Sequence, residues 1–369
     1  MKTIALGTVF SGIGAIESAL KYLGIKTNIV FACDNGEREL QTPYHEIDKL
    51  MIGKNDEEKQ KIINYLYEET GRKNLVKETY FANYEIAEDK WYEDIKYLDG
   101  HKFKNKIDLY VGGSPCQSFS VNGKRAGLND VRGTLFYEFA RIIDEARPKV
   151  FIYENVRGML NHDHGRTWKS IKEVFDDLCY DIYLSDEKLP IVNSKDYGIP
   201  QNRERIFVVG FRRDLKIKDF CFPKKIELTT TTLDYLEPHV DAKYYLKEKG
   251  FKFVTSNPSR ARVGTLIMGC QKANQQFNWN GDFIFETVDS LKNRPDVLER
   301  AYIGKWNGQT GVCRKYTPRE CLRLMGFHDD FKIIHTDDVM YRQSGNSIVV
   351  NVLMELVKSI IETGVWNDD

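Results

Sequence analysis

The sequence predicts an α/β protein whose main domain is a mostly parallel sheet with helices on both faces, joined to a smaller, irregular and β-rich domain. Short apolar runs that suit buried strands alternate with helical patterns over residues 3–211, as crossover helices between parallel strands require. From about Lys216 this periodicity weakens, and loops and short strands follow. Hydrophobic residues make up 41% of the 369 residues, which provides for a sizeable core and excludes a disordered chain.

The first predicted unit is a strand over Thr3–Phe10, a glycine-rich turn over Ser11–Gly14 and a helix from about Ala15 to Leu23. A second strand over Asn28–Cys33 ends at Asp34. Glycines in such a turn let the backbone approach a ligand at the N-terminus of the helix, and an acidic residue after the second strand can bind ribose hydroxyls. The turn therefore predicts a nucleoside or nucleotide site, with a tight turn that binds nothing as the alternative.

One residue of this unit narrows the choice of cofactor. The dinucleotide fingerprint needs a third glycine, and Glu17 stands at that position. A cofactor with ribose and adenine but without bridging phosphates therefore fits better than a dinucleotide, which argues against a dehydrogenase.

Residues 36–90 are highly charged and are predicted to be helical, most clearly over Asp56–Arg72, where apolar residues recur at helical spacing. We predict a surface insert without catalytic chemistry, with contact to a partner or to DNA as the alternative. Residues 91–98, which contain Asp94 and Ile95, lead from the insert to the next strand.

The stretch Ile107–Arg125 is the centre of the sequence. An apolar run over Ile107–Val111 suits a buried strand, and Gly112, Gly113 and Pro115 then end it abruptly, directly before Cys116. A thiol presented by a tight turn after a strand suits a nucleophile. The alternative is an inert cysteine buried at a strand end.

Helices and strands continue to alternate after this cysteine. The segment Gln117–Gly133 combines glycines with basic residues and is predicted to be a closing loop. The further predicted elements are a helix over Thr134–Ala146, a strand over Lys149–Tyr153 that delivers Glu154 and Asn155, a helix over Thr167–Leu178, a strand over Tyr180–Lys188, a turn over Tyr197–Pro200 and a strand over Ile206–Phe211.

The second domain is rich in side-chain amides over residues 269–280, and amides and arginines are the groups that recognise base edges. A polar surface loop is the alternative. The chain carries 54 basic and 54 acidic residues, but Lys195–Arg262 contains 15 basic against 9 acidic residues, a local excess of +6. Order returns with a helix over Pro318–Met325, and residues 345–347 are predicted to cap a last helix from about Ile348 to Glu362.

Cysteine usage and hydropathy indicate the compartment. The seven cysteines are scattered without a CxxC pair, which argues against a disulfide framework or a zinc site, so no metal is expected. Apolar runs stay well below the roughly 18 residues of a membrane span. The start MKTIALGTVF is better explained as a strand than as a signal peptide. We expect a cytoplasmic protein that does not bind a membrane.

Seven sequence blocks together resemble the cytosine-5 DNA methyltransferase family, and they extend over most of the chain. The blocks are, in order, TVFSGIGAIESAL, GGSPCQSFS, GKRAGLNDVRGTLF, ENVRGML, DYGIPQNRERIFVVGFR, TPRECLRLMGF and YRQSGNSIVVNVL. Their common order and spacing make the resemblance specific. It implies a Rossmann-like fold of the kind that S-adenosylmethionine-dependent methyltransferases share, with double-stranded DNA as the substrate.

The resemblance assigns roles to individual residues. Cys116 would be the nucleophile, Glu154 the acid at ring nitrogen 3 of cytosine, and Arg205 the contact to the cytosine carbonyl, with Arg203 in support. Asp34 would bind the ribose of the cofactor. The S-adenosylmethionine site would consist of Phe10, Ser11, Gly12, Ile13, Gly14, Asp34, Asp94, Ile95, Pro115, Leu135, Asn346 and Ser347, with Asp94 and Ile95 at the adenine. The DNA contacts would be Gln117, Ser120, Asn122, Lys124, Arg125 and Arg132.

The resemblance also implies a domain plan. Residues 1–215 would form the catalytic domain with its insert, residues 216–317 a target recognition domain, and residues 318–369 a return to the catalytic domain, with the last helix completing the cofactor site. The length fits a type II modification enzyme paired with a restriction endonuclease that acts on the same site, and a monomer suffices for this reaction.

Three features depart from the family pattern, two residues and the length of the insert. Thr8 stands where the family often has Asp, Asp34 where Glu is common, and the insert is longer than usual. None of them affects the three residues assigned to the chemistry. Two alternatives keep the same scaffold, a tRNA cytosine-5 methyltransferase and a non-catalytic DNA-binding protein.

Overall fold

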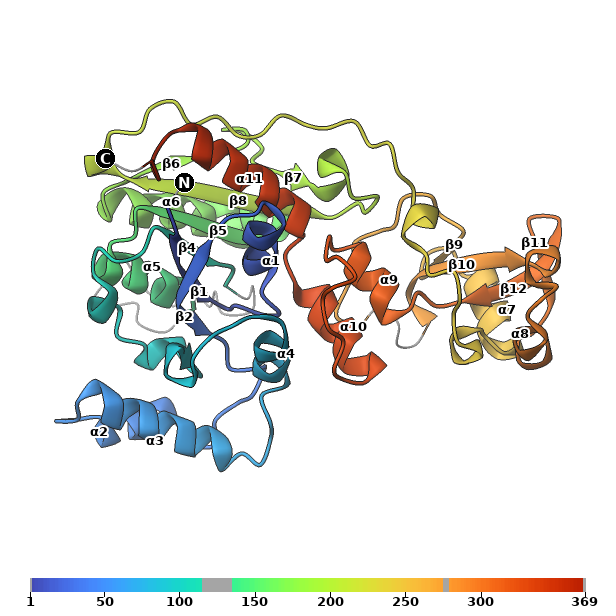
Figure 1. Cartoon of the computed structure of the whole chain (residues 1–369), viewed down its shortest axis with the longest axis horizontal. Helices are drawn as coiled ribbons and strands as arrows, with labels where there is room; N and C mark the ends of the chain where they lie inside the picture. The colour runs from blue at the N-terminus through green and yellow to red at the C-terminus, as the bar shows by residue number, and fades with distance from the viewer. Residues whose placement is uncertain (1, 115–134, 275–278, 368–369) are drawn as a thin grey trace. The chain divides into compact units, whose positions relative to one another are not determined.

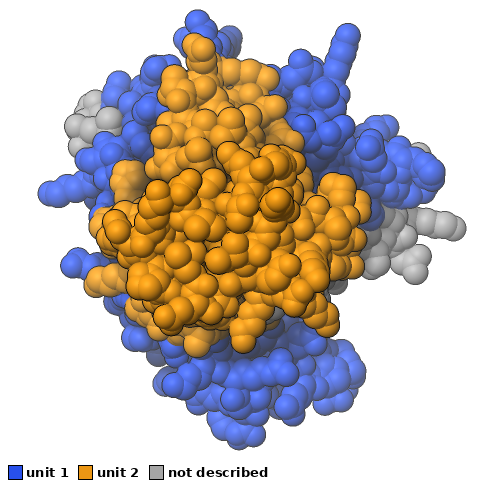
Figure 2. All heavy atoms as spheres, turned by 90° about the vertical axis from the view of Figure 1, so that its right-hand side faces the viewer, with its two compact units in different colours: residues 1–192, 204–224, 353–369 blue, residues 193–203, 225–352 orange. Residues whose placement is uncertain are grey.

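The computed structural model describes residues 2–114, 135–274 and 279–367. The chain divides into two compact units, which Figure 2 draws in different colours. Unit 1 consists of residues 1–192, 204–224 and 353–369, and unit 2 of residues 193–203 and 225–352. The chain therefore passes from one unit to the other four times.

Unit 1 is built on a sheet whose strands follow the order β3-β2-β1-β4-β5-β8-β6, with β7 paired to β8. The strands are β1 (Ile4–Val9), β2 (Thr27–Cys33), β3 (Trp91–Tyr92), β4 (Leu109–Gly112), β5 (Val150–Val156), β6 (Tyr180–Tyr183), β7 (Val192–Asn193) and β8 (Glu204–Arg212). β1 to β5 pair in parallel, whereas β8 runs antiparallel to both β5 and β6. The predicted mostly parallel sheet is confirmed.

Helices cover both faces of this sheet (Figure 1). The crossover from β1 to β2 contains α1 (Ala15–Tyr22), and α5 (Leu135–Ala146) leads into β5. The two crossovers run in opposite directions from the centre of the sheet, and since such connections are right-handed, their helices lie on opposite faces. α6 (Arg166–Asp177) packs on the same face as α5, and α11 (Val350–Glu362) lies on the face of α1.

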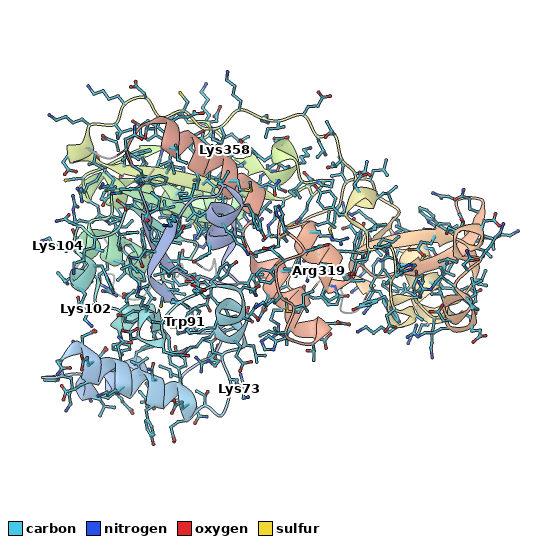
Figure 3. The ribbon with its side chains drawn as sticks, in the orientation of Figure 1. Lys73, Trp91, Lys102, Lys104, Arg319 and Lys358 are labelled. Atoms are coloured by element: carbon cyan, nitrogen blue, oxygen red, sulfur yellow. The ribbon has the colours of Figure 1, made fainter. Side chains whose placement is uncertain are left out.

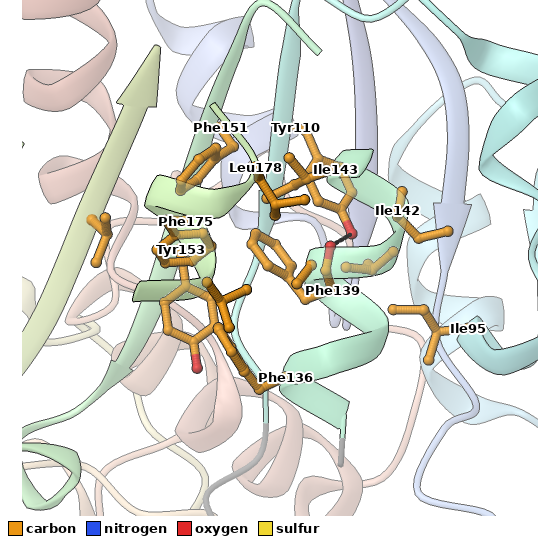
Figure 4. Packing of buried hydrophobic residues seen from close by; sticks show 14 of the residues in the cluster. Ile95, Tyr110, Phe136, Phe139, Ile142, Ile143, Phe151, Tyr153, Phe175 and Leu178 are labelled. Atoms are coloured by element: carbon orange, nitrogen blue, oxygen red, sulfur yellow. Dashed lines mark hydrogen bonds between the residues drawn. The ribbon is translucent and has the colours of Figure 1, made fainter. Parts of the chain in front are cut away.

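Aromatic residues dominate the core beneath α5 and α6 (Figure 4). The Phe139 ring stacks on Tyr110 of β4 at 4.7 Å between centroids, and the Tyr110 hydroxyl donates to the Phe139 carbonyl oxygen at 3.5 Å. Phe175 of α6 packs on Phe151 of β5 at 4.6 Å. Val150 and Ile152, which alternate with Phe151 and so point to the other face, are also fully buried. Both faces are therefore core.

The insert is helical, as predicted, with α2 (Tyr44–Leu50), α3 (Asp56–Glu68) and α4 (Leu75–Asn83). A capping box starts α3, in which Asn55 accepts the Glu58 N–H and the Glu58 side chain accepts the Asn55 N–H. α4 packs on β3 through Trp91, which Figure 3 labels. The ring of Trp91 lies 5.2 Å from that of Tyr80 of α4. The insert thus belongs to unit 1, with α4 packed on the edge of its sheet.

Unit 2 contains a four-stranded sheet in the order β11-β12-β10-β9. Its elements are α7 (Glu248–Ser256), β9 (Ala261–Val263), β10 (Gly281–Thr287), α8 (Pro295–Arg300), β11 (Gly304–Trp306), β12 (Gln309–Arg314), α9 (Pro318–Arg323) and α10 (Asp337–Asn346). The buried Arg314 guanidinium binds both carboxylate oxygens of Glu320 at 2.8 and 2.9 Å, which ties β12 to the first turn of α9. The predicted irregular, β-rich second domain is confirmed in character.

Two predicted boundaries were wrong. Residues 345–347 do not cap the last helix, because Gly345 and Asn346 end α10 and α11 starts at Val350. Position 345 requires glycine although it is helical, because a Cβ there would lie 2.5 Å from the backbone of Lys272 and Ala273. The strand predicted over Tyr180–Lys188 stops at Tyr183, since the Asp186 carboxylate accepts the N–H groups of residues 188 and 189 and forms a turn.

Residues 337–362 form the one helical stretch among the described residues that is long and apolar enough to cross a membrane. However, 61% of its most apolar window is buried inside the protein, as in the core helix of a globular protein. The stretch is also interrupted between α10 and α11.

Candidate active site

The predicted site residues of unit 1 follow the carboxyl ends of its parallel strands. Phe10 follows β1, Asp34 follows β2, and Gly113 follows β4. Glu154 lies near the end of β5, and Arg205 lies near the start of β8, which reaches the same edge because it is antiparallel. The strand order reverses between β1 and β4, and the edge of a sheet at such a reversal is where α/β proteins bind ligands.

The turn after β1 has a left-handed backbone at Phe10 (φ 51°), Gly12 (φ 53°) and Gly14 (φ 79°). The strain at the non-glycine Phe10 is of a kind that clusters at functional sites. The Ser11 hydroxyl donates to the carbonyl oxygen of Cys33 at 3.2 Å and accepts its N–H at 3.0 Å, which fixes the turn to the end of β2. Of the residues that the structure describes, a Cβ at Gly12 would meet the Phe10 carbonyl oxygen alone, at 4.0 Å, which leaves room for a ligand against the backbone there.

Asp34 is bound to this turn through its carboxylate. One oxygen accepts the Gly12 N–H at 2.9 Å, and the other accepts the Gly36 N–H at 2.8 Å. Burial raises the pKa of Asp34, and these two backbone hydrogen bonds oppose the rise. Each oxygen keeps a second lone pair that can accept a ribose hydroxyl.

Asp94 is a second buried carboxylate at this edge. Its Oδ1 accepts the Lys96 N–H at 3.0 Å, and its Oδ2 accepts the hydroxyls of Tyr44 and Tyr67, each at 3.0 Å. Ile13 and Ile95 are buried at 1% and 4% exposure, so their side chains are part of the core. Leu135, at the start of α5, is half-buried.

Glu154 and Arg205 form an ion pair, with 2.9 Å between Arg205 Nε and Glu154 Oε1. Their side chains are 13% and 16% exposed, so a ligand can reach them while most of the water is excluded. The pair lies directly beside the end of β4, because a Cβ at Gly113 would lie 2.7 Å from Glu154 Oε2. Only glycine leaves room for the carboxylate at this position.

Asn155 fixes the chain just after β4. Its side-chain amide donates to the Ser114 carbonyl oxygen at 3.0 Å and to the Tyr153 hydroxyl at 2.8 Å. The Ser114 hydroxyl is itself 2.8 Å from that of Tyr153. This buried network therefore fixes Ser114, the last described residue after β4. The sequence predicts Asn155 at the end of the strand but assigns it no role.

Arg203, Asn346 and Ser347 belong to unit 2. The Arg203 guanidinium is buried and donates to the carbonyl oxygens of Gln271 at 2.7 Å, Gly345 at 3.0 Å and Ser347 at 2.7 Å. Arg203 therefore organises the backbone around Asn346 within its own unit, and its support of catalysis stays a prediction.

Several predicted residues lie outside the described part of the chain. They are Pro115, Cys116, Gln117, Ser120, Asn122, Lys124, Arg125 and Arg132. Their roles stay predictions from the resemblance.

Thr8, the departure from the family pattern, takes part in a buried network beneath the glycine-rich turn. Its hydroxyl is 2.8 Å from that of Ser11 and donates to Glu17 Oε1 at 3.3 Å. The Tyr80 hydroxyl from the insert donates to the same Glu17 oxygen at 2.5 Å. Burial raises the pKa of Glu17 to about 7, and the hydrogen bonds from Tyr80 and Thr8 oppose the rise.

Asp99, His101 and Glu145 form one group of potential metal ligands among the described residues. The Glu145 carboxylate already accepts two hydrogen bonds from Arg141, at 2.8 and 2.9 Å, and the Gly100 N–H at 2.8 Å. Arg141 thus balances the charge of this carboxylate.

Solved structures with the same fold are methyltransferases. Over 97% of this chain and 100% of the other, the structure resembles a variant of Spodoptera frugiperda DNMT2 with a TM-score of 0.66 and 19% sequence identity. It likewise resembles the Entamoeba histolytica methyltransferase EhMeth with a TM-score of 0.64 and 17% identity, over 98% of this chain and 99% of the other. The predicted methyltransferase fold is thereby confirmed.

Sequence comparison identifies the family. The family model described as "C-5 cytosine-specific DNA methylase" matches residues 58–362. The Type II methyltransferase M.HhaI of Haemophilus parahaemolyticus is 36% identical, with 69% of this chain and 75% of the relative aligned. The Type II methyltransferase M.SsoII of Shigella sonnei is 37% identical, over 78% of this chain and 72% of the relative. This chain belongs to the C-5 cytosine-specific DNA methylase family.

The predicted activity follows from this membership. The chain is a DNA cytosine-5 methyltransferase, so it uses a methyl donor and acts on DNA. The tRNA methyltransferase and the non-catalytic DNA-binding protein are not favoured.

Proposed function

We propose that the chain transfers a methyl group from S-adenosylmethionine to carbon 5 of a cytosine flipped out of duplex DNA at one short sequence. The Glu154–Arg205 ion pair is the observation that carries this proposal. The pair brings an acid and a cation together beside the end of β4, the strand that precedes Cys116 in the sequence. An acid and a cation are the groups that a pyrimidine ring needs at its ring nitrogen and carbonyl oxygen while a nucleophile adds to it.

The residues present fit S-adenosylmethionine. Asp34 and Asp94 offer acceptors for ribose hydroxyls and for the amine of adenine, and the open backbone at Gly12 lies beside Asp34. S-adenosylmethionine supplies an electrophilic methyl group on a sulfonium centre when bound. The side chains of this site orient the nucleoside part through hydrogen bonds, and neither carboxylate needs to change its protonation during the reaction.

The protein side chains must activate carbon 5 of cytosine, which is a weak nucleophile. The Cys116 thiolate forms a bond to carbon 6, and the displaced electron pair is carried toward carbon 5 while Glu154 holds a proton at ring nitrogen 3. Arg205 binds the cytosine carbonyl and orients Glu154. After methylation a base, water in our scheme, removes the proton of carbon 5. The bond from sulfur to carbon 6 then breaks and Cys116 leaves as a thiolate.

None of these groups can reach a base that is stacked in a duplex, so the cytosine must be flipped out, which costs a few kcal/mol of unstacking. We assign the positioning on phosphates to Gln117, Ser120, Asn122, Lys124, Arg125 and Arg132. The recognition of the sequence belongs to residues 216–317.

The biological setting is part of the proposal. The type II relatives support a modification enzyme that protects the site of a cognate restriction endonuclease. The six cysteines in the described part of the chain are free thiols, which supports the reducing cytoplasm. We propose a monomer, since one catalytic unit and one recognition unit suffice for this reaction.

The test is methylation by wild type and by Cys116→Ser with tritiated S-adenosylmethionine and unmethylated genomic DNA, followed by bisulfite mapping. Cys221→Ser, at an exposed cysteine, is the matched control. We expect wild type and Cys221→Ser to protect cytosines in one short motif and Cys116→Ser to protect none. Glu154→Gln and Arg205→Ala should lower kcat by on the order of 10²-fold.

Two outcomes would contradict the proposal. Labelling of DNA by Cys116→Ser at the wild-type rate would exclude this cysteine as the nucleophile. Labelling of tRNA but not of DNA by the wild type would replace the substrate.

A further inference from the structure

The insert, for which the sequence predicts no chemistry, supplies two hydroxyls to a carboxylate of the proposed cofactor site. Tyr44 lies at the start of α2 and Tyr67 near the end of α3, and both donate to Asp94 Oδ2 at 3.0 Å. We propose that Tyr44 and Tyr67 are positioning residues that orient the Asp94 carboxylate toward the adenine amine of the cofactor. This inference rests on the proposed function, in which Asp94 binds the adenine.

The number of hydrogen bonds that each Asp94 oxygen accepts explains how the two tyrosines orient the carboxylate. A carboxylate oxygen accepts two hydrogen bonds well, so the two tyrosines fill Oδ2. Among the described residues, Oδ1 accepts the Lys96 N–H alone. One acceptor position therefore remains for a ligand, and it lies on Oδ1. Without the tyrosines the carboxylate could rotate and offer either oxygen, which weakens a directed contact to an amine.

The same hydroxyls keep the carboxylate a good acceptor. Asp94 is 6% exposed, and burial raises its pKa, while hydrogen bonds from the Lys96 N–H, Tyr44 and Tyr67 oppose the rise. Hydrogen bonds to a charged group are among the stronger ones in proteins. Loss of these hydrogen bonds would favour the protonated form of Asp94. The protonated oxygen of that acid is a hydrogen-bond donor and does not serve as an acceptor for an amine.

The insert is built to hold these hydroxyls in place. Tyr67 is 1% exposed and packs with Ile47, Met51 and Ile63, so its ring is anchored between α2 and α3. The Tyr44 ring is 45% exposed, but it stacks with that of Tyr97 at 6.3 Å, and the ammonium group of Lys96 lies 4.7 Å from its centroid.

The insert also supports the neighbouring carboxylate, which strengthens the inference. The Asn74 amide donates to the Asp34 carbonyl oxygen at 2.8 Å and to Glu93 Oε2 at 2.8 Å, and Arg38 pairs with the same Glu93 oxygen. Position 36 requires glycine, because a Cβ there would lie 2.2 Å from Asn74 Oδ1. Residues of the insert thus hold the strand ends that carry both Asp34 and Asp94.

The test measures the dissociation constant of S-adenosylmethionine for wild type, Tyr44→Phe, Tyr67→Phe and the double variant by titration calorimetry. Tyr65→Phe is the matched control, because Tyr65 lies on the same helix as Tyr67 and is 56% exposed. A second probe is the cofactor analogue in which hydrogen replaces the adenine amine. We expect each single variant to bind S-adenosylmethionine more weakly than wild type, by a factor of at most about ten. The kcat of Tyr44→Phe and of Tyr67→Phe at saturating cofactor should equal that of wild type. The control Tyr65→Phe should equal wild type in both cofactor binding and kcat.

The analogue separates positioning from a structural role. It lacks the amine that Asp94 would bind, so wild type and variants should bind it equally. Unchanged binding of S-adenosylmethionine by both single variants would overturn the inference, as would an equal loss for cofactor and analogue. If Tyr67→Phe fails to fold, the more exposed Tyr44→Phe decides the question. A wild type that does not bind S-adenosylmethionine at all would instead refute the proposed function.

Discussion

Glu17 is a single residue whose charge should couple folding to pH near neutrality. Burial raises its pKa from 4.5 to about 7, and its Oε2 has no hydrogen-bond partner among the described residues. The folded state therefore binds a proton that the unfolded state releases above about pH 4.5. The stability that Glu17 contributes is fully present below that pH and is lost as pH rises through about 7.

We predict that Glu17→Gln removes this pH dependence. The advantage of the variant over wild type in free energy of unfolding should grow between pH 5 and pH 8 toward about 3 kcal/mol, since one pKa unit corresponds to about 1.4 kcal/mol. Urea unfolding at pH 5, 6, 7 and 8 measures this difference. Parallel stability curves for the two proteins would contradict the prediction.

At the residue scale, motifs led to predicted site residues, and the structure shows where the described ones lie. Asp34, Glu154 and Arg205 lie at one edge of the sheet because each lies at or next to a strand end, and strand ends can be found from apolar runs and breakers. Asp94 follows the two-residue strand β3, which the sequence did not predict, so only the family resemblance pointed to it. The roles of Asn155, Tyr44 and Tyr67 could not be predicted this way, because they depend on hydrogen bonds to distant residues. Tyr67 in particular matches the apolar stripe of its helix, so its pattern indicates core packing alone.

At the scale of elements, β5 and β8 depend on a glycine that faces a large ring. Gly210 pairs with Phe151, and a Cβ on Gly210 would lie 2.1 Å from that ring. The ring cannot move easily, because Phe175 and Tyr180 pack on it at 4.6 and 5.3 Å. A methyl group at this position must therefore displace a packed core residue.

We predict that Gly210→Ala lowers the free energy of unfolding by about 1–3 kcal/mol, the typical cost of overpacking a core. Gly158→Ala is the control, because a Cβ there would meet its nearest neighbour, Val156, at 3.9 Å. Thermal unfolding followed by circular dichroism compares the two variants. Equal melting temperatures would show that the ring adjusts without cost.

Elements with strong periodicity were predicted well, and those that tertiary contacts impose were not. α1, α5 and α6 match the predicted helices within a few residues, because their apolar spacing is clear. α10 was missed because Gly345 argues against a helix. The glycine is required there by a tertiary contact, since the backbone of Lys272 and Ala273 approaches it closely. The antiparallel direction of β8 likewise depends on pairing with β5 and β6, which a local pattern does not encode.

At the scale of the whole molecule, unit 1 is assembled from three separate segments, of which residues 353–369 are the last. In α11 the side chains of Leu353, Leu356, Val357 and Ile360 are at most 1% exposed. Each such side chain contributes about 1.5–3 kcal/mol through burial, so together they rival the 5–15 kcal/mol by which a typical domain is stable.

We predict that a chain truncated after Val352 does not fold its unit 1. Leu356→Ala, a graded version of the same change, should cost about 2–5 kcal/mol. Lys358→Ala, at an exposed position of the same helix (Figure 3), should have little effect. Solubility and circular dichroism of the three proteins test this expectation. A soluble truncated chain with a wild-type melting temperature would refute it.

The four passages of the chain between the units have a consequence for biosynthesis. The longest segment of unit 2, residues 225–352, is complete before the residues of α11 that unit 1 needs have been translated. On the ribosome unit 2 can therefore acquire its structure while the sheet of unit 1 still lacks a covering helix. A nascent chain would have to await translation of α11 before unit 1 is stable, which delays methylation until synthesis has passed residue 360.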